Sequence, residues 1–282
     1  MKNNKSPETF AFGKNWQKFL KGFDSQRLSQ AISSIQNLVN KNDLNNVTFV
    51  DAGCGSGLFS LAAYKMGAKE IISFDVDQDA VNCTKELKNR FDNPRNWQVS
   101  EGSVLNSGWL NNLTKADIVY SWGVLHHTGD MWNAITNIVN VIKPGGKLVI
   151  AIYNEKKGGL GSNEWLKIKK FYSYSPSIIK KIMEGIMTLR YIFKPTFSSL
   201  KKDKDIKLAY QIFKSRFTSM SHLSRGMELK TDNRDWLGGL PYEFASTDQI
   251  INFCQKLNLE LEKIIPDGGK SLGNNQFVFV KK

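Results

Sequence analysis

The sequence is poor in cysteine and contains no long apolar run. Its three cysteines (Cys54, Cys83 and Cys254) show no CxxC spacing, which argues against a disulfide framework and a zinc site, so we expect no metal. The best candidate for a membrane span, residues 178–193, carries three basic residues and a glutamate, so we expect no spanning helix. The first ten residues, MKNNKSPETF, lack an apolar core, so we expect no signal peptide and a cytoplasmic protein.

Acidic residues are scarce in one part of the chain. The 282 residues carry 39 lysines and arginines against 26 aspartates and glutamates, a net charge of +13. Residues 155–240 hold 18 of the basic and 8 of the acidic residues, so most of the surplus lies there. A basic segment on a nearly neutral body suggests an acidic substrate, RNA or a membrane surface. A merely solvated lysine-rich surface is the alternative.

Short apolar strands alternate with helical segments between residues 47 and 153. The pattern predicts a parallel sheet with helices on both faces, and hence an α/β fold. Asp130 is a plausible N-cap for the last of the helices, and KPGG (143–146) is expected to end it. The predicted strands are 47–50, 71–75, 97–103, 116–123 and 147–153, and the predicted helices are 58–66, 77–91 and 130–142.

The alternation lapses at Asn154 and returns near residue 245. There STDQ (246–249) predicts a capping box at the start of a helix. Two strands follow, LELEKII and NQFVFV, and must run antiparallel because no helix connects them. We therefore expect three parts of the chain. They are an N-terminal helical lid (1–46), a core formed by two stretches (47–153 and 245–282) and a basic, mostly helical cap inserted between these stretches at 154–244.

The stretch DAGCGSG (51–57) directly follows the first strand. A dinucleotide fingerprint needs glycine at its sixth position, but counting from Gly53 that position is Leu58. The Lys-Ser/Thr pair of a phosphate-binding loop is also missing, so a pyrophosphate ligand is not expected. Asp75, at the tip of the second strand, is placed to accept hydrogen bonds from both hydroxyls of a ribose. The pattern therefore favours a nucleoside without a pyrophosphate.

These motifs together resemble one family. DAGCGSG, FDVD, the EGS after the third strand, YSWGVLHHT, KPGGKL and the terminal hairpin are similar to landmarks of the class I S-adenosylmethionine-dependent methyltransferases. The likeness is greatest to small-molecule bacterial enzymes such as quinone and sugar O-methyltransferases. It implies a three-layer, Rossmann-like, seven-stranded sheet whose last strand is antiparallel, with the cap between strands 5 and 6.

The resemblance also implies a set of residues that hold S-adenosylmethionine. Asp51, Gly53, Gly55 and Gly57 would lie against its methionine part, Asp75 would bind the ribose and Val76 would pack on the adenine. Ser103 stands where many members have an aspartate near the adenine amino group, which leaves that contact open. Ser121 and Trp122 would line the exposed side of the cofactor. Cys54 is interpreted as a small filler of the loop, because nothing nearby would activate its thiol.

His126 and His127 follow the fourth strand on the edge where the reaction would occur. If the acceptor is a hydroxyl, a base must remove its proton, and an imidazole is suited to that. Related O-methyltransferases place a base in such a pair, whereas other members use it structurally. The sequence does not choose between the two histidines. It predicts O-methylation of a small, anionic or lipid-like acceptor.

Two further segments carry predictions about the acceptor. FGKNWQKFL (12–20) is expected to close over the cofactor as an amphipathic lid or to pack on the sheet. The isoleucine and methionine stripe at 178–187, flanked by lysines, is expected either to touch a membrane surface or to form plain cap core. Candidate substrate contacts near the end of the insertion are Arg225, Asp232, Arg234, Asp235, Tyr242 and Glu243, with a salt-bridged cap as the alternative.

Other classes of function stay open. An RNA methyltransferase using the basic cap is the runner-up, although no RNA-binding module and no NPPY-like tetrapeptide after strand four is present. DNA is not expected as a partner. A cofactor-binding subunit without catalysis is the non-enzyme alternative, and the retained glycine loop and His pair argue against it. The acceptor's identity and the oligomeric state are not readable from the sequence.

Overall fold

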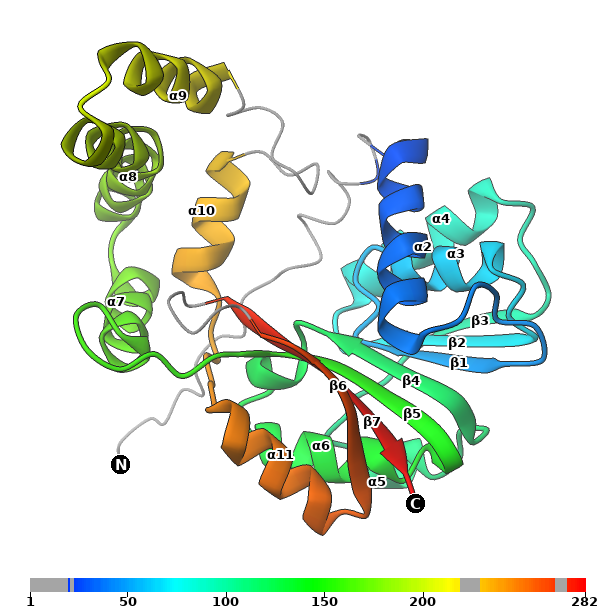
Figure 1. The fold of residues 1–282 in the computed structure, drawn as a ribbon. Helices are drawn as coiled ribbons and strands as arrows, with labels where there is room; N and C mark the ends of the chain where they lie inside the picture. The colour runs from blue at the N-terminus through cyan, green and yellow to red at the C-terminus, as the bar shows by residue number, and fades with distance from the viewer. Residues whose placement is uncertain (1–19, 21–22, 219–228, 267–272) are drawn as a thin grey trace. The chain divides into compact units, whose positions relative to one another are not determined.

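The computed structural model describes residues 20, 23–218, 229–266 and 273–282 (Figure 1). The chain divides into two compact units. The first, here called the sheet unit, comprises the described residues of Ala11–Glu164 and Pro241–Lys282. The second, the helical unit, comprises the described residues of Trp165–Leu240. The N-terminal lid prediction for residues 12–20 falls outside the described residues, apart from Leu20.

A single seven-stranded sheet forms the centre of the sheet unit, in the order β3-β2-β1-β4-β5-β7-β6. The first five strands are parallel, and β7 runs antiparallel to both of its neighbours. The predicted fold class is therefore confirmed. The strands are β1 (Thr48–Ala52), β2 (Glu70–Asp75), β3 (Trp97–Glu101), β4 (Ala116–Trp122), β5 (Ile142–Tyr153), β6 (Leu259–Ile265) and β7 (Asn274–Lys281).

Helices cover both faces of this sheet, and each face has its own apolar core. Side chains alternate along a strand, so Val50 packs in one core while Phe49 packs in the other. On the Phe49 side lie α2 (Ser25–Val39), α3 (Leu58–Lys65) and α4 (Gln78–Arg90); on the Val50 side lie α5 (Ser107–Leu110), α6 (Met131–Val139) and α11 (Thr247–Lys256) (Figure 1). The predicted capping box of Ser246 and Gln249 begins α11.

Strand β5 begins before the KPGG turn rather than after it. Ala116 of β4 pairs with Ile142, and the register then shifts so that Ile118 pairs with Lys147. The extra residues form a bulge, in which Gly145 adopts a left-handed φ of 74°. The predicted helix over 130–142 is therefore too long at its carboxyl end, because pairing with Ala116 draws Ile142 into the sheet.

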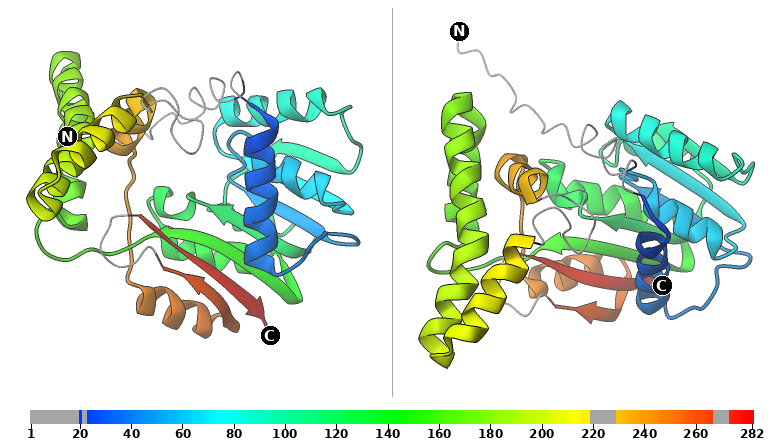
Figure 2. Two further views of the ribbon diagram at one scale, coloured as in Figure 1. Left: turned by 45° about the horizontal axis from the view of Figure 1, so that its top comes forward. Right: turned by 90° about the horizontal axis from the view of Figure 1, so that it is seen from above.

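Between β5 and α11 the described residues form helices and no further strand. They are α7 (Ser162–Tyr174), α8 (Ser177–Asp203), α9 (Ile206–Thr218) and α10 (Leu229–Gly238). Helix α8 contacts both α9 and α10, and a left-handed Lys204 turns the chain from α8 into α9 (Figure 2). No helix in the described part of the chain combines the length and the apolar character that crossing a membrane requires.

Candidate functional site

The glycine loop joins β1 to α3 at the carboxyl edge of the sheet, and backbone bonds from Gly53 and Cys54 to the carbonyl of Phe74 tie it to β2. Gly53 has a φ of 79°, and a Cβ there would lie 2.4 Å from the Val124 side chain. Gly57 has a φ of 78°, and its Cβ would meet Thr84 at 2.9 Å. Side chains are therefore excluded at both positions by conformation and by space.

Asp75 ends β2 beside this loop. Its Oδ2 accepts a hydrogen bond from the Gly55 backbone N–H (3.0 Å), and its Oδ1 accepts one from the Asp77 N–H (3.0 Å). Burial raises the pKa of this carboxyl, while the backbone bonds oppose the rise. Each carboxylate oxygen has a second lone pair, so the group can still accept bonds from a ligand. Val76, the next residue, is 70% exposed, so a large apolar side chain stands open beside the carboxylate.

Asp51, buried at the end of β1, terminates a chain of hydrogen bonds. Ser60 Oγ donates to Asp51 Oδ2 (2.5 Å), Ser60 and Ser73 hydroxyls are 2.7 Å apart, and the Trp97 indole N–H donates to Ser73 Oγ (2.7 Å). The Ser60 hydroxyl donates its proton to Asp51, so the Ser73 hydroxyl must donate to Ser60. Every donor in this series of hydrogen bonds therefore points toward the Asp51 carboxylate. Burial nevertheless raises the pKa of Asp51 from 3.8 to about 7.

Three other predicted cofactor residues have different surroundings. Ser103 follows β3 and accepts a hydrogen bond from the Leu105 N–H (3.2 Å), close to Asp75, whose carbonyl binds the neighbouring Gly102 N–H. Ser121 is fully buried in β4 and donates to the Ala52 carbonyl (2.9 Å). Trp122 is half-buried, with its ring 6.0 Å from that of Phe59.

The histidine pair forms a single 3-10 turn, η1 (Leu125–His127), after β4. His126 is buried, whereas His127 retains exposed surface. His127 Nδ1 lies 2.6 Å from the Pro241 carbonyl oxygen. A carbonyl only accepts, so Nδ1 carries the proton, and the lone pair of the neutral ring is on Nε2. Tyr153, at the end of β5, packs against both imidazoles, with ring centroids 4.0 Å from His126 and 5.4 Å from His127.

Residues 242 and 243, which were predicted to contact substrate, make contacts within the protein. Tyr242 is buried against Tyr153 and Phe244, and burial raises the pKa of its phenol to about 12. The Glu243 carboxylate accepts hydrogen bonds from the backbone N–H groups of Gly129 and Met131, at 2.9 to 3.2 Å. Glu243 therefore caps α6, and the predicted cap Asp130 makes no side-chain bond there.

The other residues predicted to contact substrate are numbered 225 to 235. Arg234 is bound by Glu184 of α8 through two contacts of 3.3 Å, and Glu184 also accepts the Tyr172 hydroxyl proton (2.6 Å). This geometry matches the alternative of a salt-bridged cap for Arg234. Arg225 and the side chain of Asp232 lie outside the described residues. Asp235 interacts electrostatically with the buried Lys169. Burial lowers the pKa of Lys169, and the negative charge of Asp235 offsets part of that lowering.

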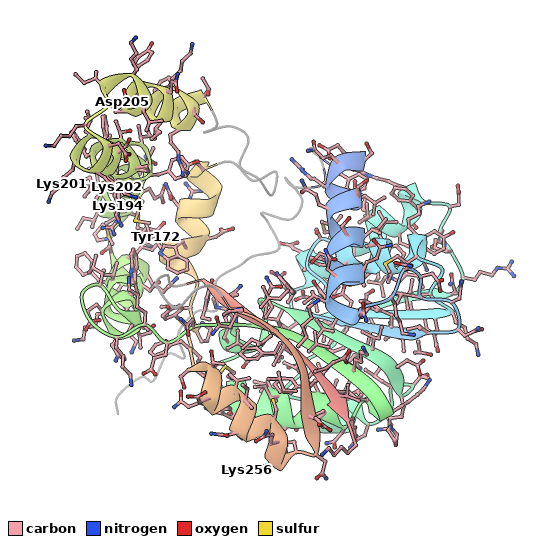
Figure 3. The ribbon with its side chains drawn as sticks, viewed as in Figure 1. Tyr172, Lys194, Lys201, Lys202, Asp205 and Lys256 are labelled. Atoms are coloured by element: carbon pink, nitrogen blue, oxygen red, sulfur yellow. The ribbon has the colours of Figure 1, made fainter. Side chains whose placement is uncertain are left out.

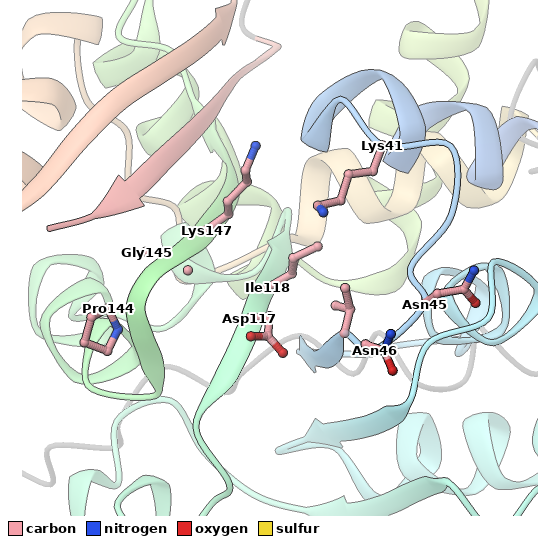
Figure 4. Close-up of a pocket in the computed structure, with 10 residues that line it drawn as sticks. Lys41, Asn45, Asn46, Asp117, Ile118, Pro144, Gly145 and Lys147 are labelled. Atoms are coloured by element: carbon pink, nitrogen blue, oxygen red, sulfur yellow. The ribbon is translucent and has the colours of Figure 1, made fainter.

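A pocket of about 360 Å³ lies at the opposite end of the strands (Figure 4). It is lined by residues after α2 and by the starts of β4 and β5, among them Lys41, Asp117 and Gly145. Lys143 and the Thr48 N–H both bind the Asp117 carboxylate. None of the predicted site residues lines this pocket. Within the described residues, no group of three or more histidines, cysteines or carboxylates is arranged to hold a metal ion.

Sequence reasoning missed several residues that organise the site. Ser60, Ser73 and Trp97 support Asp51, and the Pro241 carbonyl and Tyr153 hold the histidines. One signal was available: Tyr153 ends a predicted strand at the same edge as the glycine loop. The contact between His127 and Pro241 was hidden because the two residues are 114 positions apart, and the serines were hidden because their positions facing Asp51 depend on how β1, β2 and α3 pack.

The chain is similar to known proteins in both sequence and fold. Residues 50–150 match a family model described as a methyltransferase domain. A ribosomal protein L11 methyltransferase of Hamiltonella defensa is 35% identical over 107 residues, which make up 38% of this chain and 32% of the relative. Another, from Shewanella sp. (strain ANA-3), is 42% identical over 134 residues, 46% of this chain and 40% of the relative. The matched segments thus span less than half of these relatives.

Solved structures extend the likeness over nearly the whole chain. Magnesium protoporphyrin IX methyltransferase from Synechocystis, solved with bound SAH, has a TM-score of 0.52 at 12% identity, covering 95% of this chain and 94% of that one. A putative S-adenosylmethionine-dependent methyltransferase from Methanococcus maripaludis has a TM-score of 0.52 at 15% identity, covering 100% and 97%. Identity this low shows the shared fold alone. Residues 50–150 thus match a methyltransferase domain in sequence, and the fold of the chain resembles that of these solved structures.

Proposed function

We propose that the protein transfers a methyl group from S-adenosylmethionine to a hydroxyl group of a small molecule. The observation that carries this proposal is the pairing of two features at one sheet edge. One is the glycine loop with Asp75 and Val76, and the other is a histidine whose Nδ1 is held by a backbone carbonyl. The first feature suits a sulfonium nucleoside, and the second supplies a base for a hydroxyl acceptor.

The residues present fit the cofactor. The Asp75 carboxylate has more lone pairs than backbone donors, so it can still accept a hydrogen bond from a ribose hydroxyl, and the exposed Val76 offers an apolar surface for the adenine. The loop glycines keep side chains away from the strand end, so backbone can approach a ligand closely. When bound, S-adenosylmethionine supplies an electrophilic methyl group on a positively charged sulfur.

His127 is the base in this proposal, rather than His126. His127 is the partly exposed member of the pair, and its Nδ1 contact with Pro241 leaves the lone pair on Nε2. His126 is buried against Tyr153, so it supports the turn. We expect His127→Gln to lower turnover at least about a hundredfold, within the usual range for loss of a general base. Its affinity for the donor should stay within about threefold, because Gln changes no residue of the glycine loop.

The donor site is tested by calorimetric titration with S-adenosylmethionine. We expect Asp75→Ala to weaken binding at least about tenfold, because the ribose hydroxyls lose their charged acceptor. Asp77→Ala is the matched control, because it also removes a carboxylate near the end of β2. The Asp77 carboxylate caps α4 by accepting a hydrogen bond from the Asp79 N–H. The backbone N–H of residue 77, which donates to Asp75, is retained in this variant. Equal affinity for wild type and Asp75→Ala would contradict the cofactor assignment.

The acceptor is tested with methyl-labelled donor. Labelled product should appear in the small-molecule fraction of a metabolite extract, and its formation should fall in His127→Gln. Two other acceptors have some support: the curated relatives are named for ribosomal protein L11, and the basic helical unit suits RNA. Ribosomal protein and tRNA therefore form separate arms of the same assay. Label confined to either macromolecule would overturn the small-molecule proposal while leaving the donor site intact.

A further inference from the structure

Helix α8 carries a stripe of large apolar side chains on its exposed face. The members are 38% to 69% exposed and follow one another at intervals of three or four residues, which places them on one side of a helix. The apolar stripe consists of Ile178, Ile182, Ile186, Leu189, Phe193 and Phe197. Monomeric proteins seldom leave such a continuous apolar surface open without an interaction partner.

The stripe is not the core of the helical unit. A different face of α8 is buried, and it includes Glu184, Ile192 and Ser199. Glu184 on that face binds Tyr172 and Arg234, and Asn233 of α10 donates to the Thr188 hydroxyl (3.0 Å). Helix α10 thus packs on a partly polar face, while the more apolar one stays open. The alternative of plain cap core is therefore wrong for Ile178, Ile182 and Ile186, which are more than half exposed.

Basic side chains lie along one flank of the stripe. At about 100° per residue, Arg190, Lys194 and Lys201 project just beyond Phe197, on the side away from the buried face. All three are exposed, and Figure 3 shows Lys194 and Lys201 on α8 with Lys202. We call them the basic border. The acidic residues of α8 are Glu184, which is buried and paired, and Asp203 in its last turn.

Helix α9 also combines exposed apolar side chains with a positive charge. Its exposed apolar residues include Ile206 (77%) and Phe217, and the helix contains no acidic residue. The Phe193 ring lies 5.8 Å from the Phe213 ring, and the Arg216 guanidinium lies 4.7 Å above Tyr191 of α8. These contacts join the two helices into one amphipathic surface with a positive charge.

We propose that the exposed face of α8 and α9 binds the surface of an anionic lipid bilayer. An interfacial helix inserts an apolar face at the boundary between headgroups and acyl chains, while lysines and arginines contact anionic headgroups. The stripe supplies the apolar face and the basic border supplies the cations. The helices lie on the surface rather than crossing it, since no described helix is apolar enough to span a membrane.

The same observations disfavour two other occupants. Two copies joined through this face would bring two basic borders together, at a cost in repulsion. RNA binding to single strands relies on aromatic platforms for stacked bases, whereas four of the six stripe residues are aliphatic. The inference does not depend on the proposed methyl transfer, because lipid binding is measured without donor or acceptor.

The test is co-flotation of the full-length protein with vesicles. We expect binding to vesicles containing about one third phosphatidylglycerol, and at least about fivefold less to vesicles of phosphatidylcholine alone. Because exposed charges are screened by salt, binding to the anionic vesicles should weaken between about 0.05 M and 0.5 M NaCl.

Matched variants separate the two components of the surface. Ile182→Ser/Ile186→Ser should reduce binding to anionic vesicles at least about tenfold, because the apolar insertion is lost. Lys194→Glu/Lys201→Glu should reduce binding similarly and remove its salt dependence. Lys256→Glu and Ile265→Ser change an exposed lysine and an exposed isoleucine of the sheet unit, and should bind like wild type. Circular dichroism spectra should match that of wild type for every variant.

Three outcomes would overturn the proposal. The first is no difference between stripe variants and the sheet-unit controls. The second is absence of flotation together with a dimer, measured by analytical ultracentrifugation, that Ile182→Ser/Ile186→Ser dissociates; this would assign the face to a second copy. The third is salt-sensitive tRNA binding without vesicle binding, which would assign the basic border to RNA.

Discussion

The two units of the molecule use apolar and polar side chains in opposite ways. In the sheet unit, apolar side chains fill two cores around the strands, and buried polar groups such as Ser60 and Ser73 converge on Asp51 beside the glycine loop. In the helical unit, Glu184 and Lys169 are buried at helix contacts while an apolar stripe faces outward. Buried polar groups thus support the glycine loop in the sheet unit, whereas in the helical unit they hold helices together and leave apolar side chains exposed.

Each unit also buries an ionisable group whose pKa is brought close to neutral pH. Burial raises the pKa of Asp51 from 3.8 to about 7. Burial lowers the pKa of Lys169 from 10.5 to about 7, and this ammonium group lies 4.4 Å above the Trp236 ring and donates to the Trp236 carbonyl. Near neutral pH both groups are close to losing their charge, but one does so as pH falls and the other as pH rises.

The largest expected effect concerns the pH dependence of stability at Asp51. Between pH 4 and 7 the native state keeps a proton that the unfolded state has released, so this group makes the protein less stable as pH rises. Three pKa units correspond to about 4 kcal/mol as an upper figure. In urea unfolding experiments, Asp51→Asn should therefore exceed wild type in stability at pH 8 and lose that advantage toward pH 4.

Lys169→Met provides the comparison in the helical unit. Between pH 7 and 10.5 the unfolded state holds a proton that the native lysine lacks, so this group adds stability as pH rises. The advantage of Lys169→Met over wild type should thus be largest below pH 7 and shrink toward pH 10. The same direction of pH dependence in both variants would contradict the assignment of burial as the common cause.

The second-largest expected effect is the loss of stability when a glycine of the loop is replaced. Gly53→Ala introduces both a left-handed alanine and a contact with Val124, so we expect a loss of about 2–4 kcal/mol in the free energy of unfolding. Gly145→Ala has a similar φ of 74° but no atom within 4 Å of the new Cβ, so it should lose only about 1–2 kcal/mol. Adding Val124→Ala should restore part of the stability of Gly53→Ala but none of Gly145→Ala.

The smallest expected effect is the loss of stability when one carboxylate in each unit is replaced by an amide. Glu184→Gln weakens the bonds to Arg234 and the buried Tyr172 hydroxyl, and should cost about 1–3 kcal/mol. Glu86→Gln removes an exposed partner of Arg90 in the sheet unit and should cost under about 1 kcal/mol. Thermal unfolding followed by circular dichroism measures both. If the two substitutions cost the same, the polar contact between α8 and α10 does not stabilise the helical unit.

The sequence by itself determined the features that depend on neighbouring residues. Strand and helix periodicity predicted the sheet, the capping box at Ser246 predicted the start of α11, and three glycines after β1 predicted the tight loop. Asp75 was predicted from its place at the end of a strand. All of these follow from local backbone preferences, which a short stretch of chain expresses without its partners.

Only the tertiary structure decided which distant groups meet. Glu243 replaces Asp130 as the cap of α6 from more than 100 positions away, and Pro241 selects the His127 tautomer over a similar separation. Ser121 points into the core because the pleat of β4 turns it inward, and the α8 stripe is exposed because α10 occupies a different face. Such pairings depend on how the packed elements cross, and residue spacing alone carries no information about that. The glycine loop and the position of Asp75 were therefore readable in the sequence, whereas the contact of His127 with Pro241 and the exposed stripe of α8 emerged only from the fold.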